Sequence, residues 1–182
     1  MALIDSPSPI LYNLGGGLLT GAKYSGTTPP AAEYFIDLGN IVDVSFQGDV
    51  KTVEHKSTRA ATIYIDDQRV TFTNYSFDFK LDEWIQFNIA LLVQGRIVGN
   101  VIYGFQAVQD YWSFKLHTIH GSAYENQIWW FKKVKMIPAG ATNLIDMEKY
   151  QEMPLKAQGL ADQINYAASP LFDITCLQVG AS

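Results

Sequence analysis

Residues 71–95 pass without a spacer from the two-residue hydrophobic period of a strand to the period of a helix. From position 74 to position 81 the odd residues are apolar and the even residues are polar, which is typical of a half-buried strand. Large apolar side chains then recur at helical spacing. We expect a helix over about residues 82–94, with Asp82 capping its first turn and Gly95 taking the left-handed conformation at its end.

Most of the remaining chain from Glu33 onward reads as strands separated by turn residues. Asp66, Asp67 and Gln68 are expected to form a tight turn. The runs typical of strands cover positions 34–46, 62–65, 69–73, 97–106, 112–119, 127–137, 153–156 and 171–179. One short helix in an otherwise strand-rich chain predicts a mainly β fold, in which antiparallel neighbours joined by short turns form a meander.

The first 32 residues differ from the rest in composition. They contain four of the seven prolines and five of the fourteen glycines. We therefore expect an extended N-terminal arm over residues 1–32, followed by a single β domain over residues 33–182. Apolar residues such as Leu11, Tyr12 and Leu18 favour an arm that contacts another subunit, and a disordered tail is the alternative.

The composition argues for a surface that is partly covered. Hydrophobic residues make up 48% of the chain and charged residues only 17%, against roughly 25% in soluble domains. Contact with other subunits would explain this, and so would an apolar β-barrel monomer. The net charge of -5 gives no overall attraction to phosphate backbones. No apolar run approaches the roughly 20 residues that span a bilayer, and a single cysteine predicts synthesis in a reducing cytoplasm.

The sequence shows no pattern of catalytic or metal-binding residues. His55, His117 and His120 lack the spacing of a metal site, and there is no G-x-S-x-G or H-E-x-x-H motif. The acidic pairs at 66–67 and 82–83 are explained by a turn and a helix start. We expect no enzyme, no cofactor and no metal.

Two further patterns have a packing interpretation. The basic run at 132–135 is expected to be an ordinary solvated strand face. Trp129 and Trp130 would point to opposite sides of a strand, so they would not form one stacking platform.

The segment from Glu33 to about position 50 has one apolar and one acidic-polar face. Its polar parity comprises Asp37, Asp43, Ser45, Gln47 and Asp49. A bulge or bend is expected at Gly39 and Asn40. Residues 51–61 are polar and predict a long loop, which includes Glu54, His55, Lys56, Ser57, Thr58 and Arg59.

The order of these pieces resembles the major tail tube protein of long-tailed bacteriophages over about residues 33–180. The matching pieces are residues 34–41 before an alternating strand, the polar loop start at 54–57, the strand-to-helix passage at 81–84 and 88–95, and later 131–135, 138–140 and 155–159. Type VI secretion tube proteins are similar in architecture.

The resemblance implies an antiparallel β-sandwich or barrel-like tail-tube fold with one flanking α-helix. It also implies a structural subunit that forms hexameric rings, which stack into a tube whose lumen conducts DNA into the host. Its partners would be further copies of itself and the tape-measure, tail-terminator and baseplate proteins, in the tail of a virion assembled in the host cytoplasm. The acidic-polar face would line the lumen, where carboxylates repel phosphate and DNA passes without specific binding. A solvated outer surface is the alternative for that face. The 51–61 loop, and also the 1–32 arm, would reach the next ring.

Two other classes of protein compete with this interpretation. One is a monomeric β-barrel that binds a small apolar ligand in a pocket lined by Trp84, Trp112, Trp129 and Trp130. The other is a β-sandwich hydrolase with an Asp or Glu pair, although no such pair stands out.

Overall fold

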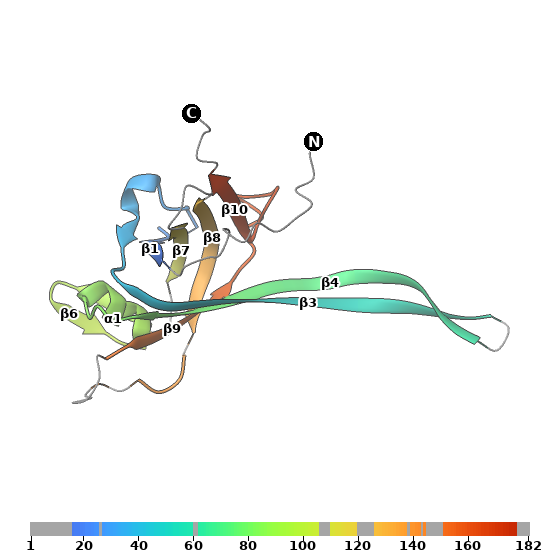
Figure 1. Ribbon diagram of the computed structural model, residues 1–182, viewed down its shortest axis with the longest axis horizontal. Coiled ribbons are helices and arrows are strands. Elements are labelled where there is room, and N and C mark those ends of the chain that lie inside the picture. Colours follow the sequence, from blue (N-terminus) through green and yellow to red (C-terminus); the bar gives the residue numbers. More distant parts are fainter. Residues whose placement is uncertain are drawn as a thin grey trace.

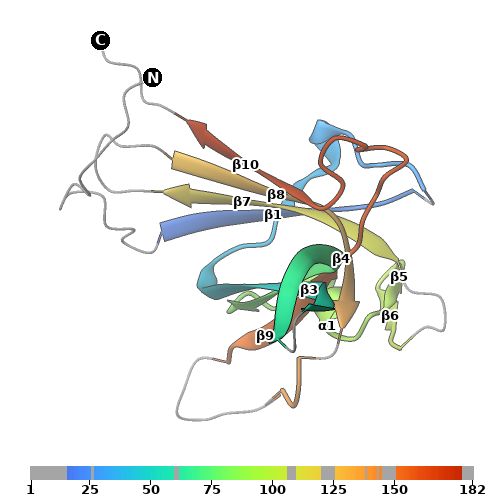
Figure 2. The ribbon, with the colours of Figure 1, turned by 90° about the vertical axis from the view of Figure 1, so that its right-hand side faces the viewer.

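A curved antiparallel sheet organises the chain, and the computed structural model shows how it folds over itself into two layers (Figures 1 and 2). The structure describes residues 16–25, 27–59, 62–105, 110–119, 126–137, 139–142, 144 and 151–177. Within these residues the sheet has eight strands, in the order β2-β1-β7-β8-β9-β4-β3, with β10 paired to β8. The mainly β fold with one α-helix is therefore confirmed.

The elements follow in chain order. They are β1 (Gly16–Lys23), the 3-10 helix η1 (Ala32–Tyr34), β2 (Ile36–Asp37), β3 (Ile41–Arg59), β4 (Thr62–Leu81), α1 (Gln86–Leu92), β5 (Arg96–Val98), β6 (Val101–Tyr103), β7 (Tyr111–Ile119), β8 (Asn126–Ile137), β9 (Met153–Gly159) and β10 (Phe172–Leu177). Strands β7, β8, β9 and β10 lie close to their predicted positions, whereas the strand expected over 97–106 is the short β5–β6 hairpin.

Strand β8 belongs to both layers of the sheet, and a β-bulge marks the change. Its first part pairs with β7 and β10, and its last residues, 134–137, pair with β9. Between the pairs Trp112↔Val134 and Phe114↔Phe131, one residue of β7 faces two residues of β8. A bulge bends a strand and increases its twist. The bulge therefore lets Phe131 and Val134 both lie in the core while β8 turns from one layer to the other.

Stacked aromatic rings fill the space between the layers. The ring centroids of Phe77 and Phe131 lie 4.3 Å apart with nearly parallel planes, and Phe114 meets Phe77 edge-on at 5.7 Å. Odd positions from Tyr75 to Leu81 are buried, as the alternation predicts.

The two longest strands form a hairpin that projects from the body (Figure 1). Strands β3 and β4 pair from Ile41↔Leu81 to Arg59↔Thr62, with three register shifts, the last of them at Asp66. The predicted loop over 51–61 is therefore wrong for residues 51–59, and the predicted turn at 66–68 is wrong; residues 60 and 61 lie outside the described part of the chain. The residues assigned to an inter-ring loop (Glu54, His55, Lys56, Ser57, Thr58 and Arg59) belong to strand β3. Residues 51–59 are mostly polar at both parities, so they lack the alternation that identifies a strand with one side in the core.

The helix begins later than predicted. Its N-cap is Ile85, and no side chain caps it, so the assignment of Asp82 as N-cap is wrong. Asp82 and Glu83 instead accept hydrogen bonds from the side-chain and backbone nitrogens of Asn40, at 2.6 and 3.2 Å. These bonds fasten the bend at Gly39, whose φ of +88° confirms the expected break.

The helix ends in a Schellman motif that is displaced by one residue from the prediction. Gln94, not Gly95, has the positive φ, at +50°. The backbone N–H groups of Gln94 and Gly95 donate to the carbonyls of Leu91 and Ala90, at 3.2 and 2.8 Å. Gly95 is required for space, because a Cβ there would lie 2.8 Å from the carbonyl oxygen of Tyr103.

The segment from Gly16 to Lys23 is part of the domain and does not belong to an arm. Strand β1 pairs with β7 along its whole length and buries Leu19 and Ala22. The predicted arm over 1–32 is wrong for this stretch, and its first fifteen residues lie outside the described part of the chain.

Replacing Phe77 with Ala should lower the free energy of unfolding by about 3–5 kcal/mol, because the truncation leaves a cavity within the aromatic stack. Urea denaturation followed by far-UV circular dichroism measures this. Replacement of the exposed Tyr34 with Ala is the control and should change stability by less than about 0.5 kcal/mol. Equal losses in both variants would contradict the assignment of the core.

Candidate assembly surfaces

The polar face of the hairpin contains four of the five residues expected on one surface. Asp43, Ser45, Gln47 and Asp49 are all exposed and alternate along β3. Asp37 is separate from them: it lies on β2, which pairs with β1, and its carboxylate accepts the backbone N–H of Gly39 at 2.9 Å.

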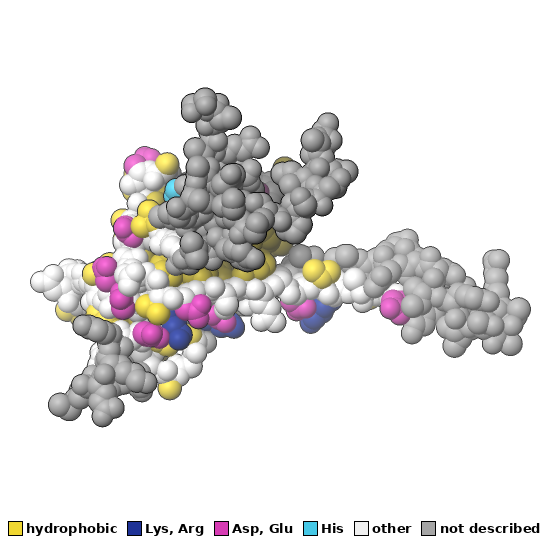
Figure 3. All heavy atoms as spheres, in the orientation of Figure 1, with side chains coloured by type: hydrophobic (Ala, Val, Ile, Leu, Met, Phe, Trp, Pro, Cys, Tyr) yellow, Lys and Arg dark blue, Asp and Glu magenta, His cyan; other side chains and the backbone are white. Residues whose placement is uncertain are grey.

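This face continues onto β4 and β9 and carries both signs of charge (Figure 3). The Nζ atom of Lys156 lies 3.1 Å from Asp78, and that of Lys80 lies 3.1 Å from Glu152. The expectation of an acidic-polar face therefore missed the lysines and their partners. The alternation of residues 74–81 was the signal for Asp78 and Lys80, since it places them on the polar side of a strand that pairs with β3.

Strand β3 is the last strand of the described sheet, so its outer edge faces away from the sheet. The same strand carries exposed apolar side chains: Val42, Phe46, Val50 and Val53 are each at least 40% exposed. A long unpaired edge with apolar side chains is a template for pairing with another chain. These residues make the hairpin the strongest candidate for contact between subunits.

An apolar hollow of about 340 Å³ opens between the layers, at the end of the body where β1 and β8 begin. Its walls include Val42, Val44 and Phe46 of β3 on one side and Leu116 and Trp129 on the other. The ring of Phe46 reaches into the aromatic core, with its centroid 5.6 Å from that of Trp129 and 5.8 Å from that of Tyr75. The hollow is thus an unfilled extension of the core.

The four tryptophans do not converge on one pocket. Trp129 lines the hollow, whereas Trp130 donates to Ser113 Oγ at 3.0 Å on the other side of the strand. Trp112 packs edge-on against the ring of Phe87, and Trp84 donates its indole N–H to the carbonyl of Gln151 at 3.1 Å. The arrangement expected for a ligand-binding barrel with four tryptophans is therefore not formed.

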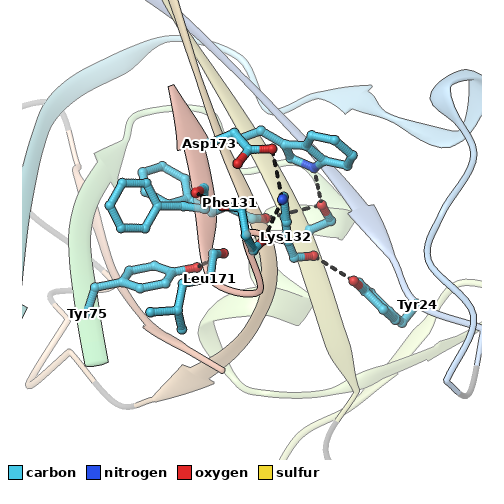
Figure 4. Close-up of polar contacts among 10 residues, drawn as sticks. Tyr24, Tyr75, Phe131, Lys132, Leu171 and Asp173 are labelled. Carbon is cyan, nitrogen blue, oxygen red and sulfur yellow. Dashed lines mark hydrogen bonds and ion pairs between the residues drawn. The ribbon is translucent and has the colours of Figure 1, made fainter. Parts of the chain in front are cut away.

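An ion pair between a buried lysine and a partly exposed aspartate connects β10 and the segment before it to β8 (Figure 4). Lys132 is only 3% exposed, so the expectation of a solvated basic run is wrong for this residue. Its Nζ lies 2.8 Å from the carboxylate of Asp173 and also donates to the carbonyl of Ser169. Lys132 lies on the same side of β8 as Trp130, which is paired with Asp173, and it contacts the ring of Tyr166 there. Its burial therefore comes from a segment distant in the sequence, which local alternation cannot anticipate.

Tyr24 joins the same cluster from the end of β1. Its hydroxyl lies 2.8 Å from the Lys132 carbonyl and 3.3 Å from a carboxylate oxygen of Asp162. Burial, with Tyr166 and Asp162 nearby, raises the pKa of Tyr24 well above its usual value, so it remains a hydroxyl. The side-chain amide of Asn165 donates to both carboxylate oxygens of Asp162, at 3.0 and 2.9 Å. The cluster ties three distant segments together, and its role is structural.

Neither a membrane span nor a metal cluster is found in the part of the chain that the structure describes. No helix there is long and apolar enough to cross a bilayer. Within the same residues, no group of three His, Cys, Asp or Glu side chains could hold a metal ion.

Replacing Asp173 with Asn should cost about 2 kcal/mol at neutral pH, because the buried Lys132 ammonium loses its counter-charge. Partial burial raises the pKa of Asp173, but hydrogen bonds from Lys132 and Ser169 and the charge of Lys132 outweigh it, so the pKa lies below its usual value. A depressed folded-state pKa stabilises the fold above the unfolded value of about 4, and this stabilisation is lost as the pH falls.

Urea denaturation at pH 7 and pH 3 measures both effects. The wild type should lose more stability on acidification than the Asp173→Asn variant, and the variant should keep the sensitivity due to Asp162, whose pKa is also lowered. The same acid-induced loss in both proteins would show that the ion pair does not contribute.

Comparisons with known proteins identify the fold. No protein-family model and no curated protein matches the chain, whereas 17 chains of solved structures do. One of these is the tube terminating cap of the anti-feeding prophage, solved by cryo-electron microscopy, with a TM-score of 0.52. The match covers 97% of this chain and 100% of that chain at 6% sequence identity. The two proteins therefore share a fold along almost their whole lengths.

Proposed function

We propose that this chain is a structural, non-catalytic subunit of a phage-type tail tube and assembles into stacked hexameric rings. The observation that supports this most directly is the long β3–β4 hairpin, which projects beyond the body and leaves the outer edge of β3 unpaired within the described sheet. The fold shared with a tube terminating cap points to the same class of assembly.

The two ends of the described sheet suit head-to-tail pairing. At one end lies β3, with 19 residues, and at the other lies β2, which covers only Thr20 and Gly21 of β1. Edges of different length favour pairing between different strands of neighbouring subunits, and such a heterologous contact closes into a ring when the rotation is suitable. Ring closure removes the exposed edges.

The length of the hairpin suits contact with the next ring. Its 19-residue strand spans about 60 Å. Beyond the pair Gln47↔Ser76, β3 and β4 pair only with each other in the described sheet. The distal half therefore gains most from a neighbour, and it replaces the predicted loop as the inter-ring contact.

The polar face of the hairpin layer is the candidate lumen wall. Lys80 and Lys156 are engaged by Glu152 and Asp78, so the cations on this face are partly neutralised before DNA arrives. Asp43 and Asp49 would repel phosphate. DNA would then pass without specific binding, in a virion tail that also contains tape-measure, tail-terminator and baseplate proteins.

A second candidate is the terminating cap itself, because the matching structure is a cap. Negative-stain electron microscopy of the concentrated protein, with its mass by light scattering, separates the two. A tube subunit gives hollow tubes of many rings, and a cap gives single rings. A persistent monomer in the presence of tail components would contradict both.

Shortening the hairpin should abolish tubes without unfolding the body. Residues 54–68 are replaced by Asn-Gly, which joins the directly paired Val53 and Arg69 through a two-residue turn. We expect a folded monomer and no tubes by electron microscopy, with circular dichroism as the folding control. Tubes of normal length would remove the distal hairpin from the interface.

Reversing the charge of the lumen wall should slow DNA without preventing assembly. The Asp43→Lys, Asp49→Lys double variant adds cations that bind phosphate in a salt-dependent manner. We expect normal tubes but at least ten-fold lower infectivity of particles built from it. Gln163→Lys, which adds a positive charge at an exposed turn before β10, controls for an effect of added positive charge elsewhere on the surface. Unchanged infectivity would place the polar face outside the lumen.

A further inference from the structure

The surface formed by helix α1 and the β5–β6 hairpin has the composition of a protein interface. Arg96 is the only charged residue between positions 85 and 105. Large apolar side chains there are between 37% and 76% exposed, and they belong to Ile85, Ile97, Val98, Val101, Tyr103 and Phe105. The centre of a protein interface is poor in Lys, Asp and Glu and rich in aromatic residues and Arg. We call Arg96 and these apolar residues the β5–β6 patch.

The fold holds this patch in place although its two strands are separate from the main sheet. Strands β5 and β6 form a two-stranded sheet of their own in the described structure, and such a hairpin alone is only marginally stable in water. Helix α1 supports it at both ends. The side chain of Gln86 donates to the carbonyl of Gly99 at 3.0 Å, and the backbone N–H of Phe105 donates to the carbonyl of Val93 at 2.7 Å. A surface that is already ordered loses less entropy when a partner binds.

Phe105 is exposed to solvent with a strained backbone. Its φ of +51° lies in the left-handed region, which is unusual for a bulky residue. Its side chain is 76% exposed, so the core gains nothing from this conformation. Strained residues of this kind cluster at sites of function, where the surrounding structure enforces them. Phe105 is therefore the best candidate for an aromatic anchor in a contact with another molecule.

One side of strand β3 has matching properties. Because side chains alternate along a strand, Val50 and Glu54 lie on the same side as Val44 and Phe46, which line the apolar hollow. Glu54 is the only charged residue on that side between positions 43 and 54. Val50 is 57% exposed and lies beyond the residues that pair with β9. This side of distal β3 is thus apolar with one anion, whereas the β5–β6 patch is apolar with one cation.

The two surfaces lie at opposite ends of the molecule (Figure 1). Two copies placed in line and in the same orientation therefore bring the hairpin of one copy to the patch of the other. Such a head-to-tail contact uses different surfaces of the two copies, so it repeats from copy to copy. A contact between two patches would instead bring two Arg96 side chains together, and like charges repel.

We propose that the β5–β6 patch binds the side of distal β3 that carries Val50 and Glu54 in a second copy of the chain. Tyr103 and Phe105 supply the aromatic contacts, and Arg96 of one copy neutralises Glu54 of the other. The proposal rests on the proposed function, because it names the surface that receives the hairpin, but the contact itself is measurable without a tube.

Disulfide trapping between two singly substituted proteins tests this contact. In a Cys176→Ser background, Val50→Cys protein is mixed with Val101→Cys protein under mild oxidation. The matched control replaces Val50→Cys with Asp49→Cys, the preceding residue, which lies on the polar side of β3. We expect the first mixture to form the mixed disulfide dimer at least ten-fold faster than the control. Val98→Cys, at a position 49% exposed and paired with Val101, replaces Val101→Cys if circular dichroism shows that variant to be unfolded.

Equal rates in the two mixtures would overturn the proposal, whether or not the unmodified protein forms tubes. Faster formation of Val101→Cys homodimers than of the mixed dimer would overturn it in favour of contact between two patches. Failure of the proposed function is seen separately, as an absence of rings and tubes in the unmodified protein by electron microscopy.

A lipid surface is the other occupant that an apolar patch with one cation could take. Co-sedimentation with vesicles of phosphatidylcholine and phosphatidylglycerol distinguishes it. We expect no binding of the unmodified protein to either lipid. Vesicle binding that is lost in the Phe105→Ser variant would assign the patch to a membrane and overturn the proposal.

Discussion

The extra residue in β8 is the constraint on which the rest of the fold depends. Because the bulge points both Phe131 and Val134 inward, one strand can serve two layers, and the rings of Phe77 and Phe114 can stack between them. On the side of β8 opposite Phe131, Lys132 pairs with Asp173 and contacts Tyr166 in the segment before β10. The same strand therefore contributes to the core on one side and to this ion pair on the other.

The hydrophobic core and the candidate contact surface lie in different parts of the molecule. The core lies within the folded sheet, where Phe77 contacts the rings of Phe79, Phe114 and Phe131. The long hairpin contributes to that core only through its proximal half, since β9 pairs with β4 over residues 76–81 and no further within the described sheet. Surfaces offered to other molecules can thus change without disturbing the packing that holds the body together.

The sequence predicted those features that depend on local pattern. The alternation of residues 74–81, the class of fold and four of the later strands all follow from hydrophobic period, because one side of each strand meets the core. The strands of the distal hairpin were missed because no third strand of the described sheet pairs with them there, and neither parity of residues 51–59 is consistently apolar. Lys132 was missed because its burial depends on Tyr166 and Ser169, which are distant in the sequence. The helix start after Ile85 was missed because a tertiary contact between Asn40 and Asp82 overrides the local rule.

The hairpin has a consequence for how stability is distributed along the chain. An isolated two-stranded ribbon is only marginally stable in water, and residues 49–59 with 62–74 form such a ribbon beyond the edge of the body. Its backbone amides should exchange with solvent through local opening from the tip, at a free energy well below that of global unfolding. The body of the subunit can therefore stay folded while the distal hairpin opens and closes. The hairpin amides are fully protected from exchange only when another strand pairs with β3.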